Sequence, residues 1–177
     1  MGTCLTKKPG KPLWNSMNAF RRFLTFVVFA FWMGGFTFYA SVVIPTAHGV
    51  LGSHREVGFV TQQVTHWLNF ISLPALALLT WNFFIERIRH PTLSWRLPGI
   101  TLALMFAAQI ALFAEHPILD QMLDGKTQSI ASHGQFYSLH RIYLLTAAVQ
   151  WLAAMVHAWT LTTATQSGTA SKGFPLE

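Results

Sequence analysis

The run FLTFVVFAFWMGGFTFYASVVI at residues 23–44 contains no charged side chain. As a helix rising about 1.5 Å per residue it would extend about 33 Å, which covers a hydrocarbon core of about 30 Å. Pro45 follows directly, and helices commonly end where a proline removes the backbone donor. This stretch therefore predicts a membrane-spanning helix over residues 23–45.

Three more apolar runs follow along the chain, at 67–85, 97–114 and 142–161. The first of these contains Pro74 and is followed by the charged residues Glu86, Arg87 and Arg89. Their lengths predict spans at about 66–86, 97–115 and 139–161, with a long outer loop at 46–65 between the first two spans. Four such runs leave no polar faces for the outside of a soluble fold. We therefore expect an all-α polytopic membrane protein, an antiparallel bundle of four transmembrane helices.

The composition excludes other classes of protein. The chain has 177 residues, of which 52% are apolar and only 10% are charged, against about 25% charged in an ordinary soluble domain. This excludes a soluble enzyme domain and a disordered tail. The single cysteine, Cys4, excludes a disulfide framework and a Cys-based zinc or iron–sulfur site. A cleaved signal peptide is disfavoured because the first apolar run exceeds the 7–15 residues of a signal core.

Lysine and arginine are unevenly distributed over the connections between the runs. If the N-terminus is cytoplasmic, nine lie on the inner side and three on the outer side, in agreement with the positive-inside rule. We therefore expect a multi-pass protein of the cell inner membrane with a basic cytoplasmic segment at 1–22 and a mobile cytoplasmic tail at 162–177. The net charge of +6 then indicates anchoring to anionic lipid and no nucleic-acid binding. The inner set is Lys7, Lys8, Lys11, Arg21, Arg22, Arg87, Arg89, Arg96 and Lys172, and the outer set is Arg55, Lys126 and Arg141.

Small and hydrogen-bonding residues recur at helical spacing, which is typical of contact faces between helices in lipid. In the first span these are Ala30, Gly34, Thr37 and Ser41, and Gly35 beside them would allow close backbone approach. In the fourth span they are His140, Tyr143, Ala147, Gln150, Ala154 and His157. Shorter stripes are Ala108, Ala111 and Glu115 in the third span, and His66, Asn69 and Leu73 in the second. Plain helix packing is the simplest role for these positions, including the deep polar residues Gln150 and His157.

Polar groups gather at the predicted outer ends of the spans. The candidate ligand-binding residues are His48, His66, Asn69, Glu115, His116, His140, Arg141 and Tyr143. Such a cluster could bind a small molecule or an ion, or relay protons, because histidine titrates near neutral pH. Imidazole and carboxylate together could also bind a transition metal, for which His66, Glu115 and His140 are the candidates. Alternatively these groups only anchor the helices, with Glu115 and Arg141 as an ion pair between two helix ends.

The sequence requires no cofactor. A haem between two histidines is disfavoured because no other span offers a histidine at the depth of His157, although His66 and His140 could face each other. An enzyme acting on a lipid or quinone lacks any G-x-S-x-G, P-loop or HExxH motif. We therefore expect a non-enzymatic binding or transport-related module. With 15 Phe and 7 Trp, an accessory subunit of a larger membrane complex, or a homo-oligomer, is the alternative.

The segment FWMGGFTFYA at 31–40, followed by VVIP at 42–45, resembles the first helix of the bacterial transmembrane protein 205-like family. Gly58-Phe59-Val60 before the second span and LHRIY at 139–143 are also similar to its pattern. The resemblance covers roughly residues 23–161. It implies a four-helix integral membrane protein carrying a domain of unknown function, and it implies no reaction.

Overall fold

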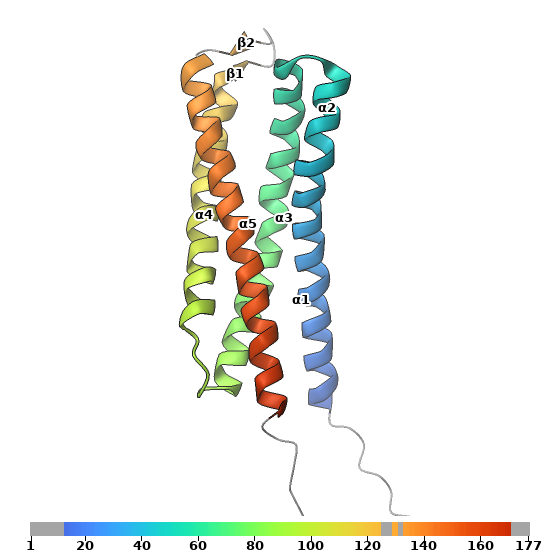
Figure 1. Ribbon diagram of the computed structural model, residues 1–177, viewed down its shortest axis with the longest axis vertical. Helices are drawn as coiled ribbons and strands as arrows, with labels where there is room; N and C mark the ends of the chain where they lie inside the picture. The colour runs from blue at the N-terminus through green and yellow to red at the C-terminus, as the bar shows by residue number, and fades with distance from the viewer. Residues whose placement is uncertain (1–12, 125–128, 131–132, 171–177) are drawn as a thin grey trace, which may run out of the picture.

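The computed structural model describes residues 13–124, 129–130 and 133–170, and within them four long helical segments run antiparallel along one axis (Figure 1). Each segment is long and apolar enough to cross a membrane. The predicted all-α bundle of four candidate membrane spans is therefore confirmed. The start of α1 and the end of α5 lie at the same end of the bundle, which follows from an even number of crossings.

The first segment consists of α1 (Leu13–Phe38), the π-helix η1 (Tyr39–Val43) and α2 (Ile44–Leu51). The other three are α3 (His54–Arg89), α4 (Arg96–Met122) and α5 (His133–Ala170). Between α4 and α5, the two-residue strands β1 (Leu123–Asp124) and β2 (Ser129–Ile130) pair antiparallel. All four segments extend beyond the predicted spans. The predicted tail at 162–177 begins inside α5, while residues 1–12 and 171–177 lie outside the described residues.

The predicted end of the first helix at Pro45 is wrong, because the helix continues through this proline. In η1 the Ile44 backbone N–H donates to the Tyr39 carbonyl, five residues earlier. This wider turn makes room for a proline ring and its missing donor. The segment ends at Gly52, whose φ of 63° is the left-handed conformation that favours glycine. Ser53 then caps α3 by accepting from the Glu56 N–H at 3.4 Å, so a tight turn replaces the long loop expected at 46–65.

The helices pack as two pairs, α1 and α2 along α3, and α4 along α5, with α3 and α4 in contact across the pairs (Figure 1). Toward the α3–α4 turn, all four segments contribute to one core, which we call the closed half. Its buried residues are Trp32, Met33, Ala75, Leu76, Leu79, Phe83, Leu102, Met105, Ala153 and Ala154. Toward α2 and the β1–β2 hairpin lies the open half. Its buried cluster of Leu112, Leu119, Phe136, Tyr143 and Ala147 comes from α4 and α5 alone.

The predicted packing face of α1 is corrected by the structure. Ala30, Gly34 and Ser41 are exposed, whereas the large side chains of Trp32 and Met33 fill the space against the neighbouring helices. The Ser41 hydroxyl donates to the Thr37 carbonyl at 2.7 Å within its own helix, so it needs no partner on another helix.

Two residues of that predicted face do contact other helices. Thr37 is exposed, but its Oγ1 accepts from Trp151 Nε1 of α5 at 3.2 Å. Gly35 lies close to α3, because a Cβ built there would be 3.7 Å from Leu68 Cδ2.

Candidate functional site

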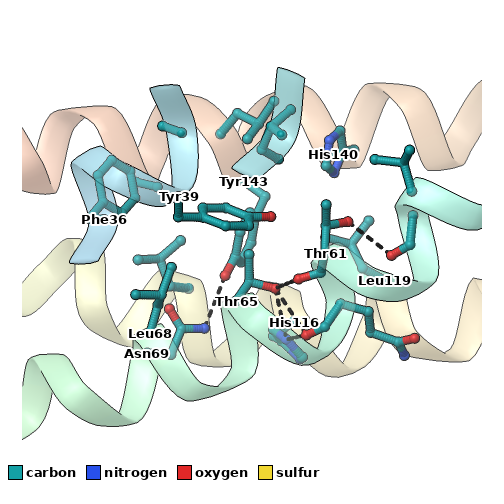
Figure 2. Close-up of a pocket in the computed structure, with 18 of the residues that line it drawn as sticks. Phe36, Tyr39, Thr61, Thr65, Leu68, Asn69, His116, Leu119, His140 and Tyr143 are labelled. Carbon is teal, nitrogen blue, oxygen red and sulfur yellow. Dashed lines mark hydrogen bonds between the residues drawn. The ribbon is translucent and has the colours of Figure 1, made fainter. Parts of the chain in front are cut away.

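A cavity of about 420 Å³ lies between the two helix pairs in the open half. Every helical segment contributes to its wall, from Trp32 and Gln150 at mid-bundle to His48 and Asp120 near the end of the bundle. The buried cluster of this half comes from α4 and α5, with Phe36 of α1 packed against it, and the cavity lies between this cluster and the segments α1 and α3. Figure 2 shows Tyr39, Thr65, Asn69, His116 and Tyr143 around this space.

The wall of the cavity combines apolar and polar side chains. Its apolar part includes Phe36, Leu68, Leu112, Leu119 and Phe136. Its polar part includes Tyr39, Thr61, Gln62, Thr65, Asn69, His116, Asp120, His140, Tyr143 and Gln150. A mainly apolar wall with a few convergent hydrogen-bonding groups is typical of small-molecule sites.

The inner end of the cavity is held by a buried polar network that joins α3, α4 and α5. Asn69 Nδ2 donates to the Tyr143 hydroxyl at 3.0 Å. The Ser72 hydroxyl lies 2.6 Å from both the Asn69 carbonyl and Gln109 Oε1. Gln109 Nε2 donates to the same Asn69 carbonyl at 3.2 Å, and Gln150 Nε2 donates to Gln109 Oε1 at 2.6 Å. The network fixes the position of the Tyr143 hydroxyl in the wall.

This network sits beside a proline. Pro74 provides no backbone N–H for the Phe70 carbonyl one turn earlier, which weakens α3 locally. The Asn69 carbonyl on the preceding residue accepts side-chain donors from Ser72 and Gln109 in the same region. Ser72 and Gln109 thus connect α3 to α4 at the turn that Pro74 weakens.

A second polar group on the wall is centred on His116. Its Nδ1 lies 2.9 Å from Asp120 Oδ2 on the same helix, and Gln62 Nε2 of α3 donates to Asp120 Oδ1 at 2.8 Å. His116 Nε2 lies 3.4 Å from the Gln62 carbonyl and 3.5 Å from Thr65 Oγ1. These contacts orient the imidazole and connect α4 to α3 in the wall of the cavity.

His140 lines the opposite side of the cavity, on α5. Its ring is stacked on Phe136 one turn earlier, with ring centroids 5.8 Å apart and an interplanar angle of 8°. Stacking holds the ring in one orientation, so that its nitrogens can serve a ligand in the cavity.

Five of the eight predicted ligand-binding residues line the cavity: His48, Asn69, His116, His140 and Tyr143. His66, Glu115 and Arg141 do not. Arg141 is exposed, and Glu115 is half-buried beside His116 without lining the cavity. His66 is exposed, with its ring centroid 5.5 Å from that of His116.

The predicted ion pair between Glu115 and Arg141 is not formed in the described part of the chain. Arg141 is exposed, and Glu115 Oε2 is buried without a hydrogen-bond partner. The metal candidates His66, Glu115 and His140 are likewise not assembled into one site. Within residues 13–124, 129–130 and 133–170, no group of three or more His, Cys, Asp or Glu side chains could hold a metal ion.

The two deep residues of the predicted packing stripe lie in different surroundings. Gln150 joins the network at the cavity, whereas His157 is fully buried in the closed half. His157 Nδ1 lies 3.1 Å from the Pro98 carbonyl and 3.0 Å from Thr101 Oγ1 of α4. Its ring also lies against Phe83, with centroids 6.4 Å apart. Through these contacts His157 holds α5 against α4, which is a role in helix packing.

Sequence reasoning missed the residues that the start of α3 brings to the cavity, above all Thr61, Gln62 and Thr65. They fell in the expected loop at 46–65. A usable signal was present: Ser53 and Glu56 have the spacing of a capping box, which marks a helix start. Extending the helical spacing back from Asn69 gives Thr65 and Thr61 on the same face. Tyr39 lies at helical spacing from Trp32 and Phe36, which also line the cavity, and it was missed because the small residues indicated another face of this segment.

Comparison with known protein families, with curated proteins and with solved structures finds no match to this chain. The resemblance to the transmembrane protein 205-like family therefore stays a prediction.

Proposed function

We propose that this membrane protein binds a small, mostly apolar molecule with hydrogen-bonding groups in the cavity between its two helix pairs. The observation that carries the proposal is the cavity itself, at about 420 Å³ with both apolar walls and oriented polar side chains. Small-molecule sites commonly measure about 300–1,000 Å³. Five of the lining residues are those that the sequence singled out as ligand-binding candidates: His48, Asn69, His116, His140 and Tyr143.

The lining favours an uncharged ligand. It contains no lysine or arginine among the described residues, and the carboxylate of Asp120 already contacts His116 and Gln62. A strongly charged ligand would thus lack a free counter-charge in a mainly apolar cavity, where an unpaired charge is costly to bury. The Tyr143 hydroxyl and the His140 ring offer hydrogen bonds to a neutral group, while Phe36 and Leu68 offer an apolar contact surface.

The closed half supports binding over passage through the bundle. A path from the cavity to the other end would have to cross a core filled by side chains of all four segments, including Leu76, Met105 and Ala154. The sequence predicted a module for either binding or transport, and we therefore favour binding.

The experiment is to measure which small molecules stay bound when the full chain is extracted from membranes in mild detergent and analysed by native mass spectrometry. Ala40 lines the cavity and is exposed, so Ala40→Trp fills the space without disturbing a packed core. Ala30→Trp is the matched control, since Ala30 is exposed on the same segment but does not line the cavity. We expect a bound molecule on the wild type and Ala30→Trp and its loss in Ala40→Trp. Equal retention in all three, or none on the wild type, contradicts the proposal.

We also propose that both termini are cytoplasmic in the inner membrane, which the nine-to-three distribution of lysine and arginine supports. This places the cavity toward the outer face. Reporter fusions in the α2–α3 turn and in the α3–α4 turn test it, because they should report opposite sides, with the α3–α4 turn inside. The reverse pattern contradicts the orientation.

The role as an accessory subunit stays a prediction. Purification in mild detergent tests it: a larger complex supports it, and a lone monomer or homo-oligomer counts against it.

A further inference from the structure

An open groove of about 770 Å³ lies at the α3–α4 turn, at the opposite end of the bundle from the cavity. Two arginines line it, Arg87 at the end of α3 and Arg96 at the start of α4. Both side chains are exposed, and neither forms an ion pair with any residue that the structure describes. The groove therefore presents positive charge that the described chain does not neutralise.

The nearest carboxylate cannot balance these arginines, because it is already engaged elsewhere. Glu86 is 2% exposed, and its Oε1 lies 2.7 Å from Arg21 Nη2 and 3.1 Å from Arg22 Nη2. Arg89 Nη1 approaches the same oxygen at 3.8 Å. Glu86 thus faces α1, and among the described residues it is the one carboxylate in this end of the bundle. The unpaired cations of the groove are left to an external anion.

Apart from Ser94, the rest of the groove is mainly apolar and continues along the exposed side of α4. Phe83, Leu93, Ile100 and Ala103 form this part, and Ile100 is exposed. Trp95 borders it with its ring held by an Nε1–H bond to the His90 carbonyl at 2.8 Å. Tryptophan is typical of the headgroup level of a membrane. Two cations next to an apolar trough match a molecule with an anionic head and a hydrocarbon tail.

We infer that the groove at the α3–α4 turn binds an anionic phospholipid, with the phosphate between Arg87 and Arg96 and an acyl chain along Ile100 and Ala103. Basic pockets between membrane helices are suited to phospholipid headgroups, and guanidinium groups bind phosphate through paired hydrogen bonds. This site is separate from the cavity of the open half and does not depend on the function proposed for it.

The test uses the full chain in a neutral detergent, titrated with dioleoylphosphatidylglycerol and separately with dioleoylphosphatidylcholine, with lipid binding read by native mass spectrometry. We expect the phosphatidylglycerol to bind more tightly. Arg87→Gln and Arg96→Gln should each weaken it by about fivefold, which is the effect of one basic residue near an anionic lipid. Arg141→Gln is the control, because Arg141 is exposed at the other end of the bundle and should leave the affinity unchanged. Since the two groove arginines are exposed, their replacement should not prevent folding.

A second pair of variants tests the acyl-chain part of the groove. Ala103→Trp should weaken phosphatidylglycerol binding by filling the trough, whereas Ala107→Trp, exposed one turn further along α4 and outside the groove, should not. Equal binding of both lipids, or insensitivity to both arginine variants, overturns the inference. Binding of inorganic phosphate alone with the same arginine dependence and equal affinity also overturns it, because the site would then recognise a free anion.

Discussion

The closed half and the open half of this bundle use the same four segments and the same kind of residues, yet only one of them is filled. In the closed half Trp32, Leu76, Met105 and Ala154 come from four different segments and meet in one core. In the open half the buried cluster belongs to α4 and α5, and the space toward α1 and α3 is a cavity lined by polar groups. The difference indicates that packing in one half holds the bundle together, while the other half is shaped to receive a molecule.

The largest expected effect comes from breaking the closed half at its buried ion pair. Glu86→Ala would leave Arg21, which is 3% exposed, without its counter-charge. Removing one partner of a buried pair costs about 3–5 kcal/mol. We expect a loss of unfolding free energy of this order, measured by titration with a denaturing detergent.

Arg22→Gln is the control for this experiment. Arg22 contacts the same carboxylate at 3.1 Å, but its side chain is 51% exposed, so its loss should cost little. If Glu86→Ala and Arg22→Gln are equally mild, the buried pair is not what holds this end of the bundle.

A sharper comparison of the two halves uses two alanines on α5. Ala154 is 0% exposed within the closed core, and Ala147 is 7% exposed but lines the cavity. Ala154→Leu should destabilise the protein by about 1–3 kcal/mol through overpacking. Ala147→Leu should cost far less, since its added carbons enter empty space. Equal losses of unfolding free energy would mean that both positions are packed alike and that the halves do not differ.

The smallest expected effect is at the Asn69–Tyr143 hydrogen bond. Tyr143→Phe removes the hydroxyl that accepts from Asn69 Nδ2 at 3.0 Å. Interhelical hydrogen bonds in membrane proteins contribute about 0.6 kcal/mol on average. A double-mutant cycle with Asn69→Ala should give a coupling free energy of about this size, together with weaker retention of the bound small molecule. A coupling of zero would show that this bond does not orient the wall of the cavity.

The four spans could be predicted from the sequence because the signal is long and local: four apolar runs, each the length of a membrane core. Where the helices end depends on finer features. At Pro45 the wider turn of η1 lets the helix continue through the proline, and the apolar pattern of the sequence does not predict this turn. At α3 the start was encoded by Ser53 and Glu56, which lie before the apolar run from which the second span was predicted.

The candidate site was predictable only in part. The sequence indicates how deep a residue lies in the membrane more reliably than it indicates which side of its helix faces the cavity. His116 and Glu115 share a depth, yet only His116 lines the cavity. On α5 the spacing of His140, Tyr143, Ala147 and Gln150 followed one face over several turns, and all four line the cavity. On α1 the small residues indicated the contact face, but Trp32 and Met33 occupy it, since large side chains fill a gap that small ones would leave.

The most direct test of the difference between the halves is cysteine accessibility at the two alanines of α5. In a Cys4→Ser background, which removes the chain's only native thiol, Ala147→Cys and Ala154→Cys are each treated with a small uncharged methanethiosulfonate reagent in native membranes. Both positions are buried, so exposure alone does not separate them. We predict that the thiol at position 147 reacts from the cavity and the thiol at position 154 does not. Equal reaction, or no reaction at either position, would contradict an open half beside a closed one.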